Sequence, residues 1–125
     1  MAHGGGGAEA GWLAALRDHQ IGRALALIHT EPGTAWSATQ LAARVGMSRA
    51  SFFSRFCAVV GEPPMRYLTR WRMNTAADLI GRQPDLPIPQ LAGRMGYRSE
   101  ESFSRAFRRE LGVTPREYRQ TRLPS

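Results

Sequence analysis

The chain has 125 residues and is 42% hydrophobic, which suits one globular domain or two very small ones. Its single cysteine, Cys57, excludes an internal disulfide and a multi-cysteine metal site, and no apolar run approaches the length of a membrane-spanning helix. All 17 basic residues are arginine, against 10 acidic residues, and the resulting charge of +7 is typical of a protein that binds nucleic acid.

The start of the chain predicts a flexible segment followed by a helix. Residues 1–11 are rich in Gly and Ala and are expected to form a flexible lead that is not a signal peptide. Asp18 is then a plausible N-cap for a first helix, whose apolar residues recur at helical spacing as far as Ile28. Strand signals are nearly absent from the whole chain, so the sequence predicts an all-α fold.

Capping signals place the next two helices. Ser37 and Gln40 form a capping box that opens the second helix, and Gly46 suits the left-handed turn at its end. Ser48 caps a third helix, and Gly61 is expected to end it.

The second half of the chain continues in the same way. Pro64 begins a long helix that extends to about Ile80, because proline is tolerated in a first helical turn. A short helix around Leu91 follows, Ser99 caps the next helix, and Pro115 begins a final short one.

The same pattern occurs twice along the chain. The segment from Leu41 to Gly46 matches the segment from Leu91 to Gly96 at an offset of 50, and the residues that follow match at an offset of 51. One extra residue in the turn around Tyr97 accounts for the change of offset. The residues matched at the second offset are Ser48, Ser51, Phe52, Phe56, Gly61, Pro64 and Tyr67, with counterparts Ser99, Ser102, Phe103, Phe107, Gly112, Pro115 and Tyr118. The chain therefore contains two copies of one supersecondary unit.

Each copy has the helix-turn-helix pattern, which is a short helix, a tight turn containing glycine and a second helix with a capped start. Phe52 and Phe56 are four residues apart, as are Phe103 and Phe107, so each pair is expected to face the core. The opposite face of each second helix is then left for solvent or a ligand. An α-helix fits the major groove of B-DNA, where an arginine can bond O6 and N7 of guanine together.

The candidate DNA-binding residues lie at the start and on the opposite face of the two second helices. In the first copy they are Ser48, Arg49, Ala50, Phe53 and Ser54. In the second copy they are Ser99, Glu100, Glu101, Ser104, Arg105 and Arg108. The capped helix starts also offer amide groups to phosphates.

The chain resembles the DNA-binding domain of AraC/XylS-type transcription regulators over about residues 13–120. The resemblance rests on the runs Trp36–Phe52, Val60–Leu68 and Trp71–Ala76 of the first copy and linker, and on Ala92–Phe107 and Gly112–Arg119 of the second copy. It implies about seven helices in two homeodomain-like helix-turn-helix subdomains, expected at residues 12–62 and 84–125, with a long linker helix at residues 63–83.

The resemblance also implies a function. The protein is expected to be a cytoplasmic, sequence-specific transcription regulator, an activator, whose two recognition helices enter successive major-groove segments. The implied partners are double-stranded DNA and, as a second candidate, RNA polymerase, with no membrane contact. No cofactor, metal or catalytic residue is expected, and the effector-binding domain of most relatives is expected to be absent from this chain.

Several side chains admit two interpretations. Arg105 is the strongest candidate for a base or phosphate contact, and the alternative is a solvated surface arginine. Arg44 and Arg94 recur at matching positions and fit either DNA contacts or ion pairs, with Glu100 or Glu101 as a partner for Arg94. These two acidic residues either accept from cytosine amino groups or stabilise the helix dipole.

Two positions depart from the pattern of the family. Some relatives carry a large or basic side chain at the positions of Phe53 and Ser54, so phosphate or polymerase contact is an alternative role for the first recognition helix. Pro87 stands where an N-capping serine is usual, which predicts a looser start of the following helix.

The competing function is a helical protein-interaction module that docks on an acidic partner. Such a module needs apolar recognition faces, whereas the second recognition helix presents Ser104, Arg105 and Arg108. An enzyme is disfavoured, because no Ser/His/Asp, Cys/His or paired-carboxylate arrangement occurs at a plausible site.

Overall fold

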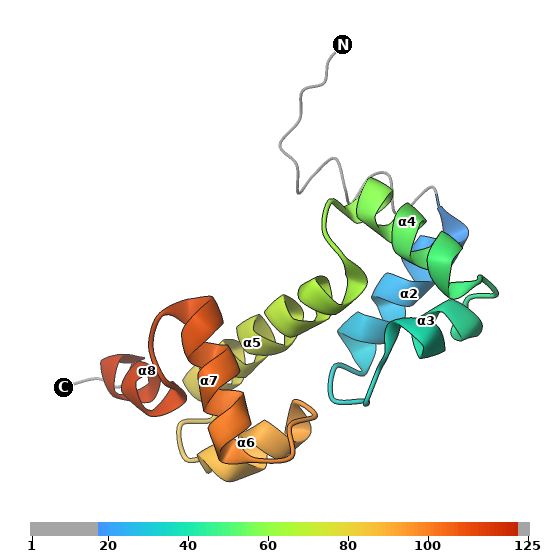
Figure 1. Ribbon diagram of the computed structural model, residues 1–125. Helices are drawn as coiled ribbons and strands as arrows, with labels where there is room; N and C mark the ends of the chain where they lie inside the picture. The colour runs from blue at the N-terminus through green and yellow to red at the C-terminus, as the bar shows by residue number, and fades with distance from the viewer. Residues whose placement is uncertain (1–17, 123–125) are drawn as a thin grey trace. The chain divides into compact units, whose positions relative to one another are not determined.

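The computed structural model describes residues 18–122, which form seven α-helices and no strand. This confirms the predicted all-α class. The helices, shown in Figure 1, are α2 (His19–Thr30), α3 (Ala38–Arg44), α4 (Arg49–Val60), α5 (Pro64–Arg82), α6 (Ile88–Arg94), α7 (Glu100–Leu111) and α8 (Pro115–Arg122). The predicted flexible lead at residues 1–11 lies outside the described residues.

The helices pack into two compact units, and the division falls inside α5. The first unit holds residues 18–30 and 36–68, and the second holds residues 31–35 and 69–122. Each unit therefore consists of a helix-turn-helix pair between two further helical segments. In the first unit these segments are α2 and the start of α5, and in the second unit they are the rest of α5 and α8.

The predicted caps are present at the start of α2 and α3. The Asp18 carboxylate accepts a hydrogen bond from the amide of Ile21 at 3.0 Å. Ser37 and Gln40 form both bonds of the capping box, each 3.1 Å long. These bonds occupy amides that the first helical turn leaves without an intrahelical partner.

The helices α4 and α7 begin and end alike, as the repeat predicts. The Ser48 hydroxyl accepts from the amide of Ser51, and the Ser99 hydroxyl accepts from the amide of Ser102, at 3.2 and 3.1 Å. Both helices end at a glycine in the left-handed conformation, Gly61 in α4 and Gly112 in α7.

The remaining helix starts show one expected weakness and one feature missed from the sequence. Pro87 is the N-cap of α6 and makes no side-chain cap bond, as predicted. At the start of α8, Thr114 and Glu117 form a second reciprocal capping box, with bonds of 2.8 and 3.2 Å. The spacing of these two residues carries the usual capping-box signal, so the sequence could have revealed it.

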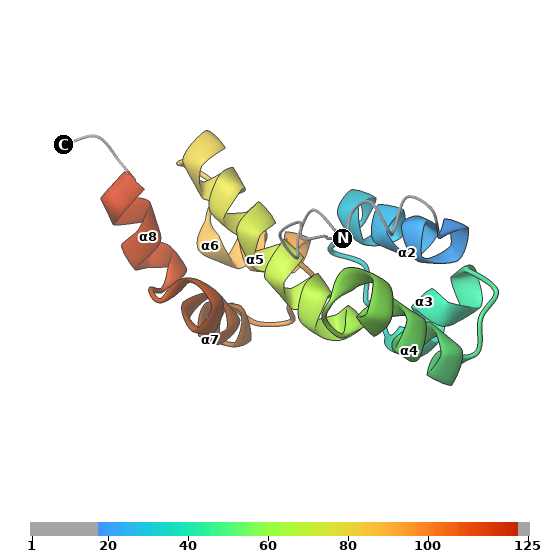
Figure 2. The same ribbon diagram turned by 90° about the horizontal axis from the view of Figure 1, so that it is seen from above.

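The cores of the two units repeat the same aromatic contacts. In the first unit the ring centroids of Phe56 and Tyr67 lie 5.9 Å apart at an interplanar angle of 71°. In the second unit the rings of Phe107 and Tyr118 lie 5.6 Å apart at the same angle. The predicted inward-facing pairs are confirmed, because Phe52, Phe56, Phe103 and Phe107 are all fully buried. The start of α5 therefore packs in the first unit as α8 packs in the second (Figure 2).

The long helix α5 differs slightly from its predicted length. It extends to Arg82, two residues beyond the predicted end at Ile80. Arg82 forms an ion pair of 2.9 Å with Asp78, one helical turn earlier, which supports this last turn. None of the helices within residues 18–122 combines the length and the apolar character needed to cross a membrane.

Candidate nucleic-acid interface

Matching backbone hydrogen bonds close the two helix-turn-helix turns. In the first unit the amide of Met47 donates to the carbonyl of Ala42 over 2.9 Å. In the second unit the amide of Tyr97 donates to the carbonyl of Ala92 over 3.0 Å. The helices α4 and α7 therefore each begin after an equivalent turn.

Glycine makes this turn possible. Gly46 and Gly96 have φ angles of +74° and +85°, in the left-handed region that a residue with a Cβ adopts only at a steric cost. The turn covers residues 45–48 in the first unit and 95–99 in the second. The second turn is thus one residue longer, which confirms the insertion inferred from the change of offset.

The candidate residues of α4 lie on its exposed surface. Arg49, Ala50, Phe53 and Ser54 are all exposed, and so is the capping residue Ser48. The Arg49 side chain makes no hydrogen bond or ion pair within the described residues, so its guanidinium is available to a ligand. Arg49, Ala50 and Phe53 also line one hollow of the surface.

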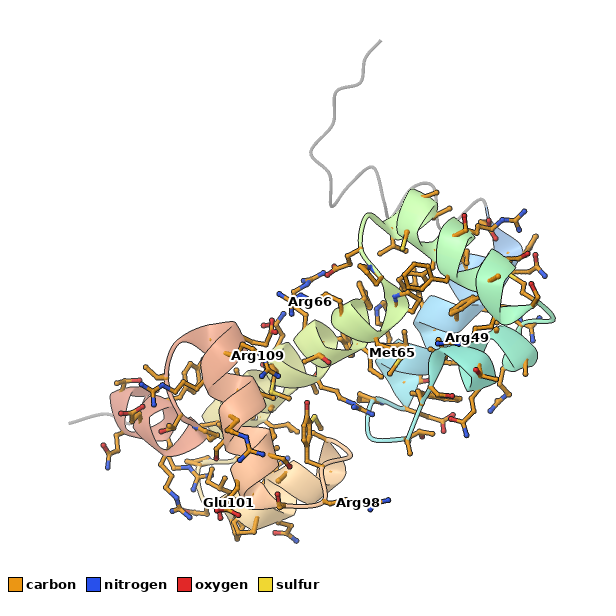
Figure 3. All side chains as sticks on the ribbon, in the orientation of Figure 1. Arg49, Met65, Arg66, Arg98, Glu101 and Arg109 are labelled. Carbon is orange, nitrogen blue, oxygen red and sulfur yellow. The ribbon has the colours of Figure 1, made fainter. Side chains whose placement is uncertain are left out.

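The candidate residues of α7 fall into two groups. Ser99, Glu101, Arg105 and Arg108 are exposed, whereas Ser104 is half-buried. Figure 3 shows the Glu101 side chain extending outward at the start of α7. The Arg105 guanidinium makes no hydrogen bond or ion pair within residues 18–122, and it therefore has its donors free for a base or a phosphate.

Glu100 is held by an ion pair inside the second unit. Its carboxylate accepts two hydrogen bonds from the Arg116 guanidinium, at 2.8 and 3.1 Å. This partner differs from Arg94, which the sequence offered as a candidate. The ion pair joins the first turn of α7 to α8, so Glu100 is less available to a base than its neighbour Glu101.

The arginine that occurs at matching positions of the two copies has different contacts in each. The Arg44 guanidinium lies over the Trp36 ring, 5.5 Å from its centroid, in a cation–π contact. Arg94, at the matching position, is exposed and makes no side-chain contact of this kind within the described residues. Of the two, Arg94 is therefore the freer candidate for a ligand.

Sequence reasoning missed two further exposed arginines, one at each end of α7. Arg98 lies in the turn before α7 and extends outward from it, and Arg109 lies in the last turn of α7 (Figure 3). It also did not anticipate that Arg55 of α4 is occupied, since it pairs with Asp18 at 3.5 Å and donates to Gln20 at 3.0 Å. Exposure and partners depend on packing, which residue spacing alone does not reveal.

The site offers charge and hydrogen-bond donors, and no grouping of metal ligands. Within residues 18–122, no three His, Cys, Asp or Glu side chains are grouped closely enough to hold a metal ion. The duplicated arrangement of two tight turns, each leading to a capped helix with an exposed face, defines a helix-turn-helix protein.

Comparison with known proteins narrows this class. Residues 41–121 match a protein family that is described as "Helix-turn-helix domain". The chain is 39% identical over 94% of its length to a "Putative AraC-like transcription regulator" of Streptomyces antibioticus, and 41% identical over 86% to the RCS-specific HTH-type transcriptional activator RclR of Escherichia coli. It spans 38% of the length of each of these relatives.

A solved structure agrees with these relatives. The DNA-binding domain of AdpA, in complex with a target DNA, has a TM-score of 0.73 to this chain and is 31% identical to it. The match covers 80% of this chain and 89% of that domain. The chain belongs to the AraC-type family of helix-turn-helix transcription regulators.

Proposed function

We propose that the chain binds double-stranded DNA in a sequence-specific manner and activates transcription, with α4 and α7 as its two recognition helices. The observation that carries the proposal is the pairing of two equivalent capped helices. Each has a buried phenylalanine pair on one side and, on the other, an exposed arginine that has no partner among residues 18–122. Arg49 fills this role in α4 and Arg105 in α7.

The chemistry of the exposed faces supports this assignment. An arginine in the first two turns of a recognition helix can bond a guanine edge or a phosphate, and the backbone amides at a helix N-terminus add further phosphate contacts. The net charge of +7 favours a polyanionic partner over a neutral one.

Two relatives support the two parts of the proposal. AdpA was solved with its DNA-binding domain on a target DNA, and RclR is described as a transcriptional activator. RNA polymerase is proposed as a second partner, because an activator acts on transcription through it. The competing protein-interaction module is disfavoured by the charged residues on the exposed face of α7.

Selection of bound sites from a pool of random duplexes tests sequence-specific binding directly. We expect a defined motif to be enriched, and Arg105→Ala to weaken binding to it by about 1–3 kcal/mol while relaxing the preference at one or two base pairs. Arg82→Ala is a charge-matched control, since Arg82 lies at the end of α5 and pairs with Asp78.

Three outcomes of this experiment are informative. A uniform loss of affinity for all sequences with Arg105→Ala would make Arg105 a phosphate contact. An equal loss with Arg82→Ala would show that only total charge matters. No enrichment of any sequence from the pool would contradict sequence-specific binding.

A further inference from the structure

The exposed face of α4 carries an aromatic residue that the protein leaves about half exposed. Phe53 is 48% exposed, and within residues 18–122 Met65, at 37%, is the only other exposed large hydrophobic side chain. Exposing this much apolar surface to water is unfavourable in the free protein. A partner that covers Phe53 would recover that free energy.

The internal repeat gives a comparison within the same chain. Ala50 and Phe53 of α4 occupy the positions that Glu101 and Ser104 occupy in α7, in helices with the same caps and the same buried pairs. The caps and the buried side of the two helices are therefore the same, while the chemistry of the exposed face differs. The α7 face can donate and accept hydrogen bonds, and the α4 face at these two positions cannot.

The size of the apolar surface indicates what kind of group covers it. Two exposed polar residues, Arg49 and Ser54, adjoin Ala50 and Phe53, and the half-buried Cys57 follows Phe53 one turn later along α4. The exposed apolar surface around Phe53 therefore consists mainly of the Ala50 methyl group and one ring. Protein-docking patches are usually larger and continuous. A group about the size of a methyl, presented beside negative charge, fits both Phe53 and the free Arg49 guanidinium.

Duplex DNA presents such a group in the major groove. The C5-methyl of thymine is the apolar feature of that groove, and alanine and phenylalanine side chains recognise it by contact. Ala50 and Phe53 are three residues apart on one helix face, so both can reach the same base or two neighbouring bases.

From this juxtaposition we infer that α4 reads the C5-methyl groups of pyrimidines through Phe53 and Ala50, while α7 reads hydrogen-bonding groups. The inference rests on the proposed function and specifies its chemistry. It has a further consequence, because 5-methylcytosine carries the same methyl at the same ring position as thymine. A cytosine placed at a recognised thymine position therefore gains the contact when it is methylated.

The experiment uses the 125-residue chain and a duplex obtained by selection from random sequences. Each thymine is replaced in turn by deoxyuridine, which removes the methyl and keeps the base pair. We expect one or two adjacent replacements to weaken binding about three- to tenfold, as expected for the loss of one buried methyl group. In a second duplex a cytosine replaces the sensitive thymine. Methylation of this cytosine at C5 is expected to increase the binding affinity by a similar factor.

Substitution of Phe53 assigns the effect to α4. In Phe53→Ala the ratio of the affinities for the thymine and deoxyuridine duplexes is expected to fall to about one at the sensitive positions. At the other positions this ratio is expected to stay unchanged, and a double-mutant cycle quantifies the comparison. Phe53→Leu, which keeps an apolar side chain, is expected to retain part of the difference. Because Phe53 is exposed, both variants should fold, and their thermal unfolding checks this.

The outcomes separate this inference from the proposed function. Specific duplex binding with no sensitivity to deoxyuridine, or with a sensitivity that Phe53→Ala leaves intact, overturns the inference and leaves the proposed function standing. Absence of specific duplex binding overturns both. Capture of a protein partner through Phe53, with DNA binding indifferent to Phe53→Ala, would assign the exposed ring to protein docking instead.

Discussion

His29 and Tyr67 form a polar contact inside the first unit. The His29 Nε2 atom lies 2.6 Å from the Tyr67 hydroxyl, and the two ring centroids lie 5.8 Å apart. Tyr67 is buried and its ring also meets Phe56 edge-on, so this contact continues directly into the aromatic core. Partial burial lowers the pKa of His29 below its ordinary value, because the charged imidazolium loses hydration.

This pKa shift predicts a pH dependence of stability. The unfolded chain binds a proton at His29 near pH 6.5, while the folded chain binds it only at lower pH. The contribution to stability is therefore complete above about pH 6.5 and is lost as the pH falls toward the folded pKa. We expect the thermal midpoint of unfolding to decrease as the pH is lowered from about 7.5 to about 5.5. In His29→Gln this decrease is expected to be smaller. Equal pH dependence in the two proteins would show that His29 is not responsible.

At the scale of elements, the segment between α2 and α3 is a structural part of the second unit. Residues 31–35 belong to that unit, although α2 and α3 belong to the first. The Arg72 guanidinium donates to the carbonyls of Pro32 and Thr34, at 2.6 and 2.8 Å, and lies over the Tyr97 ring. One side chain of α5 thus holds this segment beside the turn that leads into α7.

Gly33 permits the close approach of this segment to the helix-turn-helix turn. A Cβ at Gly33 would lie far inside van der Waals contact with the backbone carbonyl of Arg94. Gly33→Ala is therefore expected to lower the thermal midpoint, with a cost of about 1–3 kcal/mol for overpacking. Gly93 of α6 is the matched control, because a Cβ there meets nothing within 4 Å.

The control is expected to change stability in the opposite direction. Gly93 lies within α6, where alanine is favoured over glycine by about 0.5–1 kcal/mol. Unfolding of both variants, followed by circular dichroism, checks the pair. If Gly33→Ala were as stable as Gly93→Ala, the close packing of residues 31–35 on the turn would be disproved.

The guanidinium of Arg72 is expected to be required for this arrangement. Burial lowers the pKa of Arg72 while the neighbouring Tyr97 raises it, so its charge is enclosed and is satisfied by local partners. Lysine lacks the planar fork that reaches two carbonyls together, so Arg72→Lys is expected to cost about 1–3 kcal/mol.

Arg82→Lys serves as the control for Arg72→Lys in the same helix. Arg82 is exposed and pairs only one turn away with Asp78, so its replacement is expected to change stability by no more than about 0.5 kcal/mol. Chemical denaturation of the two variants and the parent chain measures both effects. Similar losses in the two variants would indicate a general effect of replacing arginine.

At the scale of the whole molecule, the excess of arginine predicts how DNA binding depends on salt. Each phosphate neutralised by an arginine releases condensed counterions, so the logarithm of the binding constant falls linearly with the logarithm of salt concentration. Contact with about five to eight phosphates predicts a slope of about −4 to −7. Titrations of a duplex at several salt concentrations measure it.

Variants of single arginines test which side chains bind phosphate. Removing one arginine that neutralises a phosphate reduces the magnitude of the slope by about 1. We expect this for Arg49→Ala and no change for Arg82→Ala. A slope near zero for the parent chain would contradict a charge-driven interface altogether.

Local sequence determined most of the architecture. The capping bonds of Ser37, Ser48 and Ser99 join residues three positions apart, and the buried phenylalanine pairs are spaced by one helical turn. Such interactions form within one helix, so they can be recognised from residue type and spacing alone. For the same reason the repeat predicted two equivalent turns, including the extra residue before α7.

The partners of the charged side chains were decided only by the tertiary structure. Arg72 bonds a carbonyl 40 residues away, and Glu100 pairs with Arg116 rather than with Arg94. An arginine has a long stem and five donors, so many partners are compatible with its sequence position. Packing of the helices selects among them, because it fixes which acceptors come within reach of each guanidinium. That selection engages Arg72 and Arg116 and, among residues 18–122, leaves Arg49 and Arg105 without a partner on the exposed faces of α4 and α7.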